Sequence, residues 1–239
     1  MPADVALVTG STSGIGRAVA ERFGNDGYRV VVNSRRSVDA GEELAQSLPD
    51  AIYVQADVSR EEDAKRLVET ALERYGRLDV VVNNAATTRR VAFADLEGAD
   101  DELWHNVLDT NVLGPWYVSR AAAAALKEAK GAIVNVGSVA GILAGGSSLP
   151  YAVSKAALHH LTRTLALALA PDVRVNAVAP GLVDTPWTEG WEMKPAIVAR
   201  TPLARAATPE DIAGAVADLA ATPFATGQVL VVDGGLGLG

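Results

Sequence analysis

Short runs of β-branched and other apolar residues recur along the chain, separated by longer stretches in which apolar residues follow a helical period. Most of the runs are continuously apolar rather than alternating, which is typical of strands covered on both faces. Between the first two runs, Ile15, Val19 and Phe23 share one face of a predicted helix. The candidate strands are seven, at residues 5–8, 29–33, 51–55, 78–82, 132–136, 173–178 and 228–232.

This alternation of strand and helix predicts a doubly wound α/β fold, a seven-stranded parallel sheet with helices on both faces. No linker-like tract divides the chain and no internal repeat is found, so residues 1–239 are predicted to form a single domain. Residues 185–205 are the exception, because they combine two of the four Trp with a Met and three Pro but show little periodicity. We expect this segment to be a lid over the functional site, since its aromatic content argues against disorder.

Composition narrows the classes of function. A chain that is 49% hydrophobic and 21% charged can bury a sizeable core. It has no Cys, which excludes disulfides, a thiolate nucleophile and cysteine-ligated zinc. With only three His, a metal site has little support. The net charge of −8, with scattered basic residues, argues against nucleic acid as a partner.

Neither a membrane segment nor an export signal is expected. The apolar run at residues 5–8 follows no basic region, so it is unlike a signal peptide. The longest uncharged stretch, residues 131–154, is long enough to cross a bilayer but is interrupted by Gly145, Gly146 and Pro150. We therefore predict a cytoplasmic protein with no membrane partner.

The first predicted strand ends in a glycine-rich turn, TGSTSGIGRA at residues 9–18, that leads straight into the first predicted helix. Such a turn lets the backbone approach a pyrophosphate, and the helix N-terminus adds N–H donors and a positive dipole. The spacing G-x-x-x-G-x-G differs from the common G-x-G-x-x-G, so ordinary turn chemistry stays an alternative. The dinucleotide contacts predicted here are Gly10, Ser11, Ser13, Gly14, Ile15 and Gly16.

The end of the second predicted strand bears on which dinucleotide binds. An acidic residue usually stands there to receive the ribose 2′-hydroxyl of NAD. This chain instead reads Ser34, Arg35 and Arg36. Arginine can hold a 2′-phosphate through two hydrogen bonds, so NADP is predicted and NAD stays possible. The alternative is that both arginines are solvated turn residues.

Tyr151 and Lys155 begin a predicted helix after Pro150, and their spacing of four places phenol and ammonium on one face. A phenol with its ordinary pKa of ~10 is a poor base at neutral pH. A neighbouring cation would lower that pKa, and bringing it to ~7 would take about 4 kcal/mol. By itself, such a pair is more often a surface lysine lying over a tyrosine.

Six motifs follow one another in order along the whole chain. They are TGSTSGIG at 9–16, NNAA at 83–86, Asn111, Ser138, the Tyr151/Lys155 pair and NAVAPG at 176–181. Together they resemble the single-domain branch of the short-chain dehydrogenase/reductase family. The resemblance extends to 3-oxoacyl-[acyl-carrier-protein] reductases and related ketone reductases, and it implies a Rossmann-type domain that binds NAD(P).

The resemblance implies four catalytic residues. Tyr151 would be the general acid/base, and Lys155 would lower its pKa while holding the nicotinamide ribose, so both also count as cofactor contacts. Ser138 would hydrogen-bond the substrate oxygen as that oxygen gains charge. Asn111 resembles the asparagine of the family that holds a water for a proton relay to Lys155.

Further cofactor contacts also follow from the resemblance. The implied contacts are Asp57 and Val58 at the adenine, Asn84, Ala85 and Ala86 at the adenosine ribose, and Pro180, Gly181, Val183 and Thr185 on the nicotinamide side. The chain departs from the family pattern at Ala86, where Gly is usual, and at Gly137, where Ser is frequent. A methyl group at position 86 would crowd the ribose.

The expected substrate walls are apolar. Trp187 and Trp191 lie in the predicted lid, and Leu143 and Leu149 lie near the predicted catalytic residues, between Ser138 and Tyr151. Together with Ser138 and Tyr151 they are the predicted substrate-binding residues, and such walls suit an apolar or aromatic carbonyl compound. The alternative is that the tryptophans anchor the loop or a subunit contact.

The sequence therefore predicts an NADP(H)-dependent oxidoreductase that interconverts a ketone and a secondary alcohol by hydride transfer. A 3-oxoacyl-[acyl-carrier-protein] reductase is the first alternative, although residues 127–131 offer an acidic carrier only Lys127 and Lys130. An NAD-dependent alcohol dehydrogenase and a non-catalytic dinucleotide-binding regulator are further alternatives. Besides a small-molecule substrate, the expected partner is a second copy of the chain, in a homotetramer or homodimer.

Overall fold

The continuous apolar runs fold into strands because β-branched side chains pack well on a sheet that is covered on both faces. The computed structural model describes residues 3–238, and the ends of the predicted domain 1–239 lie outside this range. Within it, the predicted seven-stranded parallel sheet is confirmed, with the order β3-β2-β1-β4-β5-β6-β7. The strands are β1 (Val5–Val8), β2 (Arg29–Ser34), β3 (Ala51–Gln55), β4 (Val80–Asn83), β5 (Ala132–Val136), β6 (Arg174–Pro180) and β7 (Val229–Val232).

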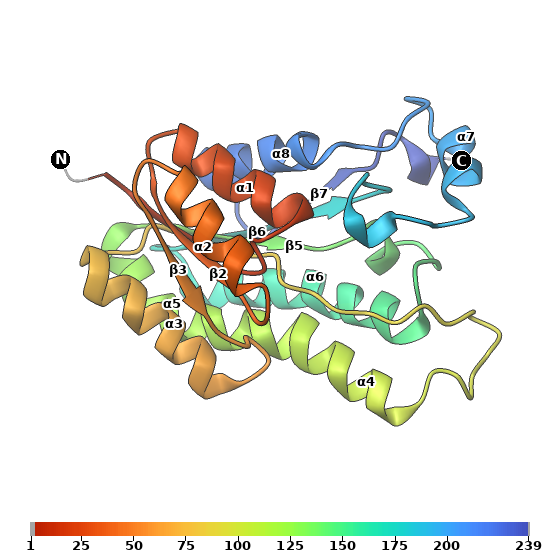
Figure 1. Cartoon of the computed structure of the whole chain (residues 1–239), viewed down its shortest axis with the longest axis horizontal. Helices are drawn as coiled ribbons and strands as arrows, with labels where there is room; N and C mark the ends of the chain where they lie inside the picture. Colours follow the sequence, from red (N-terminus) through yellow and green to blue (C-terminus); the bar gives the residue numbers. More distant parts are fainter. Residues whose placement is uncertain (1–2, 239) are drawn as a thin grey trace.

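Helices cover both faces of this sheet, as predicted, with α1, α2 and α8 on one face and α3, α5 and α6 on the other (Figure 1). Neighbouring strand residues serve opposite layers: Leu7 packs with α3 and α5, whereas Val8 packs with α1 and α8. The helices are α1 (Gly14–Asn25), α2 (Val38–Ser47), α3 (Glu61–Tyr75), α4 (Asp101–Leu108), α5 (Gly114–Ala129), α6 (Leu149–Leu169), α7 (Lys194–Arg200) and α8 (Pro209–Ala221).

The strand order changes direction between β1 and β4. From β1 the chain builds the sheet toward one edge through β2 and β3, and it then returns to place β4 on the other side of β1. In open α/β sheets a crevice forms at such a switch point, outside the carboxyl ends of the strands. The loops that follow β1, β4, β5 and β6 all leave from this edge of the sheet. The fold therefore brings the predicted motifs of distant segments to one place.

The predicted lid, residues 185–205, contains more regular structure than its sequence indicates. A single 3-10 turn spans Pro186–Thr188, and the short helix α7 follows at Lys194–Arg200. None of the residues of α7 is buried, which explains why the sequence has no apolar stripe that would predict this helix. Its Pro195 lies in the first turn, where proline is tolerated.

No helix within residues 3–238 is long and apolar enough to span a membrane. Over the same residues, no three His, Asp or Glu side chains gather as a candidate metal site.

Candidate active site

The glycine-rich turn joins β1 to α1 at the switch point and has room for no side chain at two of its positions. Gly10 has φ +60°, and a Cβ there would lie 2.8 Å from the Cα of Ala85. A Cβ on Gly16 would lie 2.4 Å from the carbonyl oxygen of Gly10. Ser13, the residue before α1, makes no side-chain cap, so the first N–H groups of the helix are left for a ligand.

A cleft of about 700 Å³ opens beside this turn and runs along the carboxyl ends of the strands. Of the six predicted dinucleotide contacts of the turn, Gly10, Ser13, Gly14 and Ile15 line it, whereas Ser11 and Gly16 do not. Ser11 is buried, and its hydroxyl ties β1 to β2 by donating to the Val8 carbonyl and accepting from the Asn33 N–H, each at 2.9 Å. Gly16 is buried, and its lack of a side chain lets α1 pack closely against the Gly10 carbonyl. Thr12 lines the cleft and was not predicted.

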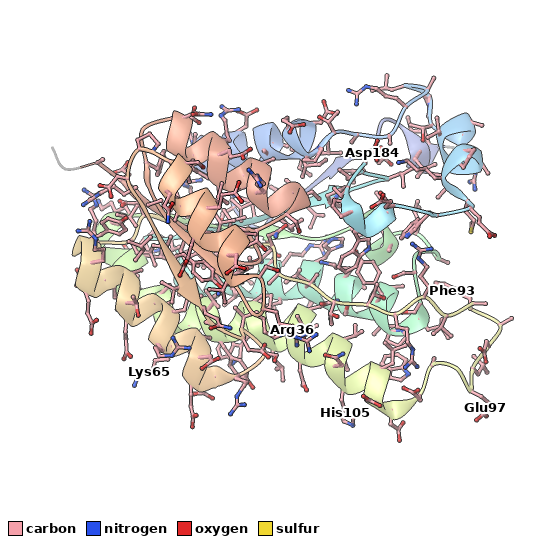
Figure 2. All side chains as sticks on the ribbon, viewed as in Figure 1. Arg36, Lys65, Phe93, Glu97, His105 and Asp184 are labelled. Atoms are coloured by element: carbon pink, nitrogen blue, oxygen red, sulfur yellow. The ribbon has the colours of Figure 1, made fainter. Side chains whose placement is uncertain are left out.

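At the end of β2, Ser34 and Arg35 line the cleft as predicted. The guanidinium of Arg35 lies 3.6 Å from the carboxylate of Asp57, with the two side chains 40% and 24% exposed. An ion pair this exposed is weak, so the guanidinium is free to exchange its partner for a phosphate. Arg36 is exposed and does not line the cleft (Figure 2), so its role as a cofactor contact stays a prediction.

The segments after β3, β4 and β6 complete the cofactor end of the cleft. Asn84 braces the glycine turn, since its side-chain amide donates to the carbonyls of Thr9 and Gly10 at 3.0 and 2.9 Å. The predicted contacts that line the cleft here are Asp57, Val58, Asn84, Ala85, Ala86, Pro180, Gly181, Val183 and Thr185.

Ser138, Tyr151 and Lys155 all line the cleft, although the first comes from the loop after β5 and the other two from α6. The cap of α6 positions the tyrosine, because the Ser148 hydroxyl accepts from the Tyr151 N–H at 3.3 Å. The side chain of Lys155 is buried and its Nζ donates to the Val136 carbonyl at 2.8 Å. That Nζ lies 5.6 Å from the centroid of the Tyr151 ring.

Burial dominates the electrostatics of this triad. It raises the pKa of the Tyr151 phenol to about 12, and a hydrogen bond with Ser138 opposes the rise only in part. Burial also lowers the pKa of the Lys155 ammonium to about 8. The expected lowering of the phenol pKa is therefore not seen for the protein alone, because desolvation dominates. The phenol stays protonated at neutral pH, in the state that can donate a proton.

Asn111 does not line the cleft but holds together the elements around it. It lies in a π-helical turn, Asp109–Leu113, between α4 and α5. Its Oδ1 accepts from the Thr87 N–H at 2.8 Å, and its Nδ2 donates to the Thr87 carbonyl and the Ser154 hydroxyl at 3.1 and 3.0 Å. The amide thus connects the strand-β4 loop to the residue before Lys155. Its role in a water relay stays a prediction.

Aromatic side chains form the substrate end of the cleft. The rings of Tyr151 and Trp187 lie 6.1 Å apart, and the guanidinium of Arg90 lies 4.9 Å above the ring of Trp191. Leu143 lines the cleft as predicted, whereas Leu149, the first residue of α6, does not. The lining residues that the sequence analysis missed include Ile197, Arg200 and Leu236.

A further missed feature lies directly behind Ser138. A Cβ at Gly137 would lie 2.2 Å from Nε2 of His159, whose side chain is buried one turn beyond Lys155. Burial, then the charges of Lys155 and Arg163, lower the pKa of His159 to about 4, against the Gly141 carbonyl that raises it. The histidine is therefore packed and neutral, and it occupies the space that a larger residue at 137 would need.

A glycine-lined dinucleotide cleft at the switch point of a parallel sheet, with serine, tyrosine and lysine converging on it, defines an oxidoreductase of the short-chain type. Residues 10–237 match the model of a protein family described as enoyl-(acyl carrier protein) reductase. The chain therefore belongs to the short-chain dehydrogenase/reductase family, whose members bind NAD(P), and it is an oxidoreductase of CH–OH and C=O groups.

Named relatives agree with this assignment. The chain is 54% identical to the provisionally named ketoacyl reductase 2 of the granaticin polyketide synthase of Streptomyces violaceoruber, over 98% of this chain and 96% of the relative. It is 38% identical to a 3-oxoacyl-[acyl-carrier-protein] reductase of Synechocystis, over 99% and 98%. A solved structure of ElxO with NADP bound has a TM-score of 0.90 at 29% identity and covers 100% of both chains.

Proposed function

We propose that this protein is an NADPH-dependent ketoreductase that reduces the ketone of a 3-oxoacyl or related substrate to a secondary alcohol. The observation that carries the proposal is the convergence of Ser138, Tyr151 and Lys155 on one cleft, with the Tyr151 phenol held protonated. A protonated phenol suits the reductive direction, in which the carbonyl oxygen must gain a proton. Relatives named as ketoacyl and 3-oxoacyl reductases support the substrate class.

The residues present fit a nicotinamide dinucleotide. The turn around Gly10 and Gly14 leaves the open backbone that a pyrophosphate needs, and the uncapped start of α1 supplies N–H donors. Asp57 and Val58 would hold the adenine side and Thr185 the nicotinamide side, as the family resemblance implies. When bound, the dinucleotide supplies the hydride.

The side chains of the chain itself would then perform the proton chemistry. Tyr151 donates its phenolic proton to the substrate oxygen, while the Ser138 hydroxyl donates a hydrogen bond to the same oxygen as it gains charge. Lys155, held by the Val136 carbonyl, places a cation near the resulting phenolate and stabilises it.

The preference for NADPH rests on the side chains at the end of β2. Ser34 and Arg35 line the cleft, and Arg35 has only a weak, exposed partner in Asp57. An Arg35→Ala variant should lose affinity for NADPH by about 10- to 100-fold, the contribution of a charge-assisted hydrogen bond, while its affinity for NADH changes little. Fluorescence titration with both dinucleotides measures this. Tighter binding of NADH than NADPH by the native chain would overturn the NADPH assignment.

A second candidate is a 3-oxoacyl-[acyl-carrier-protein] reductase, favoured by the Synechocystis relative. Lys127 on α5 and Lys130 just after it are the basic residues available to an acidic carrier protein. Rates with a carrier-bound 3-oxoacyl thioester and with the same acyl group on a small thiol separate the two candidates. Clearly faster turnover of the carrier-bound form would favour the reductase of acyl-carrier substrates.

The mechanism itself is tested by following NADPH absorbance with 3-oxoacyl thioesters and cyclic ketones. Tyr151→Phe removes only the hydroxyl, so kcat should fall at least 100-fold while NADPH binding and the unfolding midpoint hold. The matched control is Tyr117→Phe on α5, outside the cleft lining, which should keep full activity. Equal kcat in native and Tyr151→Phe proteins would overturn the proposal.

A homotetramer or homodimer stays part of the proposal. Apolar side chains are exposed on α6 at Leu167, after α8 at Phe224, and on β7 at Leu230 and Val231. Contact between copies would cover such surfaces. Light scattering of the native chain and of Leu167→Glu measures whether α6 takes part.

A further inference from the structure

The charges that line the cleft contrast with those of the whole chain. The protein carries a net charge of −8, yet the cleft is lined by three cations and a single carboxylate. That carboxylate, Asp57, lies at the cofactor end and is paired with Arg35. The charged residues that line the substrate end are therefore both cations, Lys155 and Arg200.

Of these two cations, only Arg200 is available to a ligand at a distance from the reacting carbonyl. Lys155 is buried and donates to the Val136 carbonyl beside Tyr151. Arg200 is exposed at the last residue of α7, and its side chain has no ion pair or hydrogen bond with another of residues 3–238. Its basic neighbours differ, because Lys194 pairs with Asp184 and Arg205 with Asp211.

The surroundings of Arg200 add to this contrast. Ile197 lies one turn before it on the same helix, and Leu236 reaches the cleft from beyond β7. Trp191 forms the wall on the lid side, with the Arg90 guanidinium stacked above its ring. A guanidinium is more weakly hydrated than an ammonium, so even an exposed arginine that lines such a cleft can exchange water for an oxyanion.

We propose that Arg200 binds an oxyanion, carboxylate or phosphate, on the part of the ketone substrate farthest from the carbonyl. This inference rests on the proposed reductase activity and names the substrate class for the same site. The substrate would present its ketone to Ser138 and Tyr151, its apolar middle to Trp187 and Trp191, and its anion to α7. Guanidinium matches both kinds of oxyanion, because its planar N–H groups can donate two parallel hydrogen bonds.

Two matched substrate pairs separate the sources of the anion. The first pair is a cyclic keto acid and its methyl ester, which differ in a carboxylate. The second pair is a 3-oxoacyl thioester of phosphopantetheine and of pantetheine, which differ in a phosphate. The proposal expects the native chain to have a lower KM for the anionic member of at least one pair, with that difference shrinking as salt increases.

The decisive variant is Arg200→Ala. Loss of a charge-assisted hydrogen bond should raise KM for the anionic substrate by about 10- to 100-fold, with less than a twofold change for the neutral partner. Values of kcat and the KM for NADPH should hold, and Arg200→Lys should recover part of the loss. Arg163→Ala, an exposed arginine of α6 outside the cleft lining, removes the same charge and should change nothing.

A binding measurement keeps this test separate from the reductase proposal. Quenching of the Trp187 and Trp191 fluorescence by the keto acid reports affinity without turnover. If neither pair is reduced with NADPH but Arg200→Ala still weakens quenching, the reductase proposal fails and the anion site stands. Equal KM and equal quenching for anionic and neutral members in the native chain, or an equal effect of Arg200→Ala on both, would overturn the anion site.

Discussion

Substituting Gly137 by Ala tests how tightly the strand end that carries Ser138 is packed. The added Cβ would lie 2.2 Å from Nε2 and 2.8 Å from Cδ2 of His159, and 2.9 Å from the Val178 carbonyl oxygen. Favourable contacts between heavy atoms are about 3.5–4.0 Å, so the closest approach is more than an ångström too short. His159 is 3% exposed and held on α6, which leaves its ring no open space to enter.

The expected cost is that of overpacking a closed core, about 1–3 kcal/mol of unfolding free energy. Urea denaturation should show a lower midpoint for Gly137→Ala with an unchanged slope. Because residue 137 precedes Ser138, kcat should fall as well. Gly214→Ala on α8 is the matched control, since its Cβ would meet only Arg22 at 3.9 Å. As a helix-interior substitution, it should stabilise the protein by up to about 1 kcal/mol.

A second variant identifies the clash with the imidazole. In a His159→Ala background, the same Gly137→Ala change should cost much less, because the nearest atoms are gone and only the Val178 carbonyl stays close. His159→Ala alone should cost about 2–4 kcal/mol through the cavity that it leaves. Two results would contradict this prediction. One is a Gly137→Ala protein as stable as the native one, and the other is a loss of unfolding free energy from Gly137→Ala that is undiminished in the His159→Ala background.

Three further predictions concern charge and capping. Burial lowers the pKa of His159 from 6.5 to about 4, so between these pH values the imidazole binds a proton in the unfolded chain but not in the folded protein. The unfolding free energy should therefore fall by about 3 kcal/mol from pH 6.5 to pH 4. His159→Leu should lack this part of the decrease. Arg90→Ala removes the guanidinium stacked on Trp191 and should raise the ketone KM about two- to fivefold in steady-state assays with kcat held, whereas Arg90→Lys should recover part of the effect. Thr208→Ala breaks the capping box with Asp211 at the start of α8 and should cost about 1 kcal/mol in urea denaturation, whereas Thr208→Ser should cost little.

Local patterns carried most of the fold. The seven strands were predicted from continuous apolar runs, because a strand buried on both faces has no polar position to interrupt it. Some strand ends differ from the prediction. The strand β4 begins at Val80 and not at Leu78, and the carboxylate of Asp79 accepts hydrogen bonds from the Val5 N–H and from Arg77. The helix α7 was missed because it buries no residue and therefore has no apolar period.

The sequence alone also placed chemistry at the site wherever that chemistry depends on neighbours along the chain. The spacing of Tyr151 and Lys155 puts both side chains on one face of α6, and glycine is required at Gly10 by a backbone angle that the turn itself demands. Such features follow from local geometry, so they can be inferred before any long-range contact is known.

Tertiary packing decided the rest. It turned Ser11 inward to hold two strands together, and it brought Arg200 to the cleft, although no local pattern singles out that residue within the predicted lid. It also set the direction of the Tyr151 pKa, because burial of the phenol in the folded protein raises that pKa. Which atoms surround a side chain is a property of the folded molecule, and both the desolvation and the contacts that govern its chemistry come from residues far apart in the sequence.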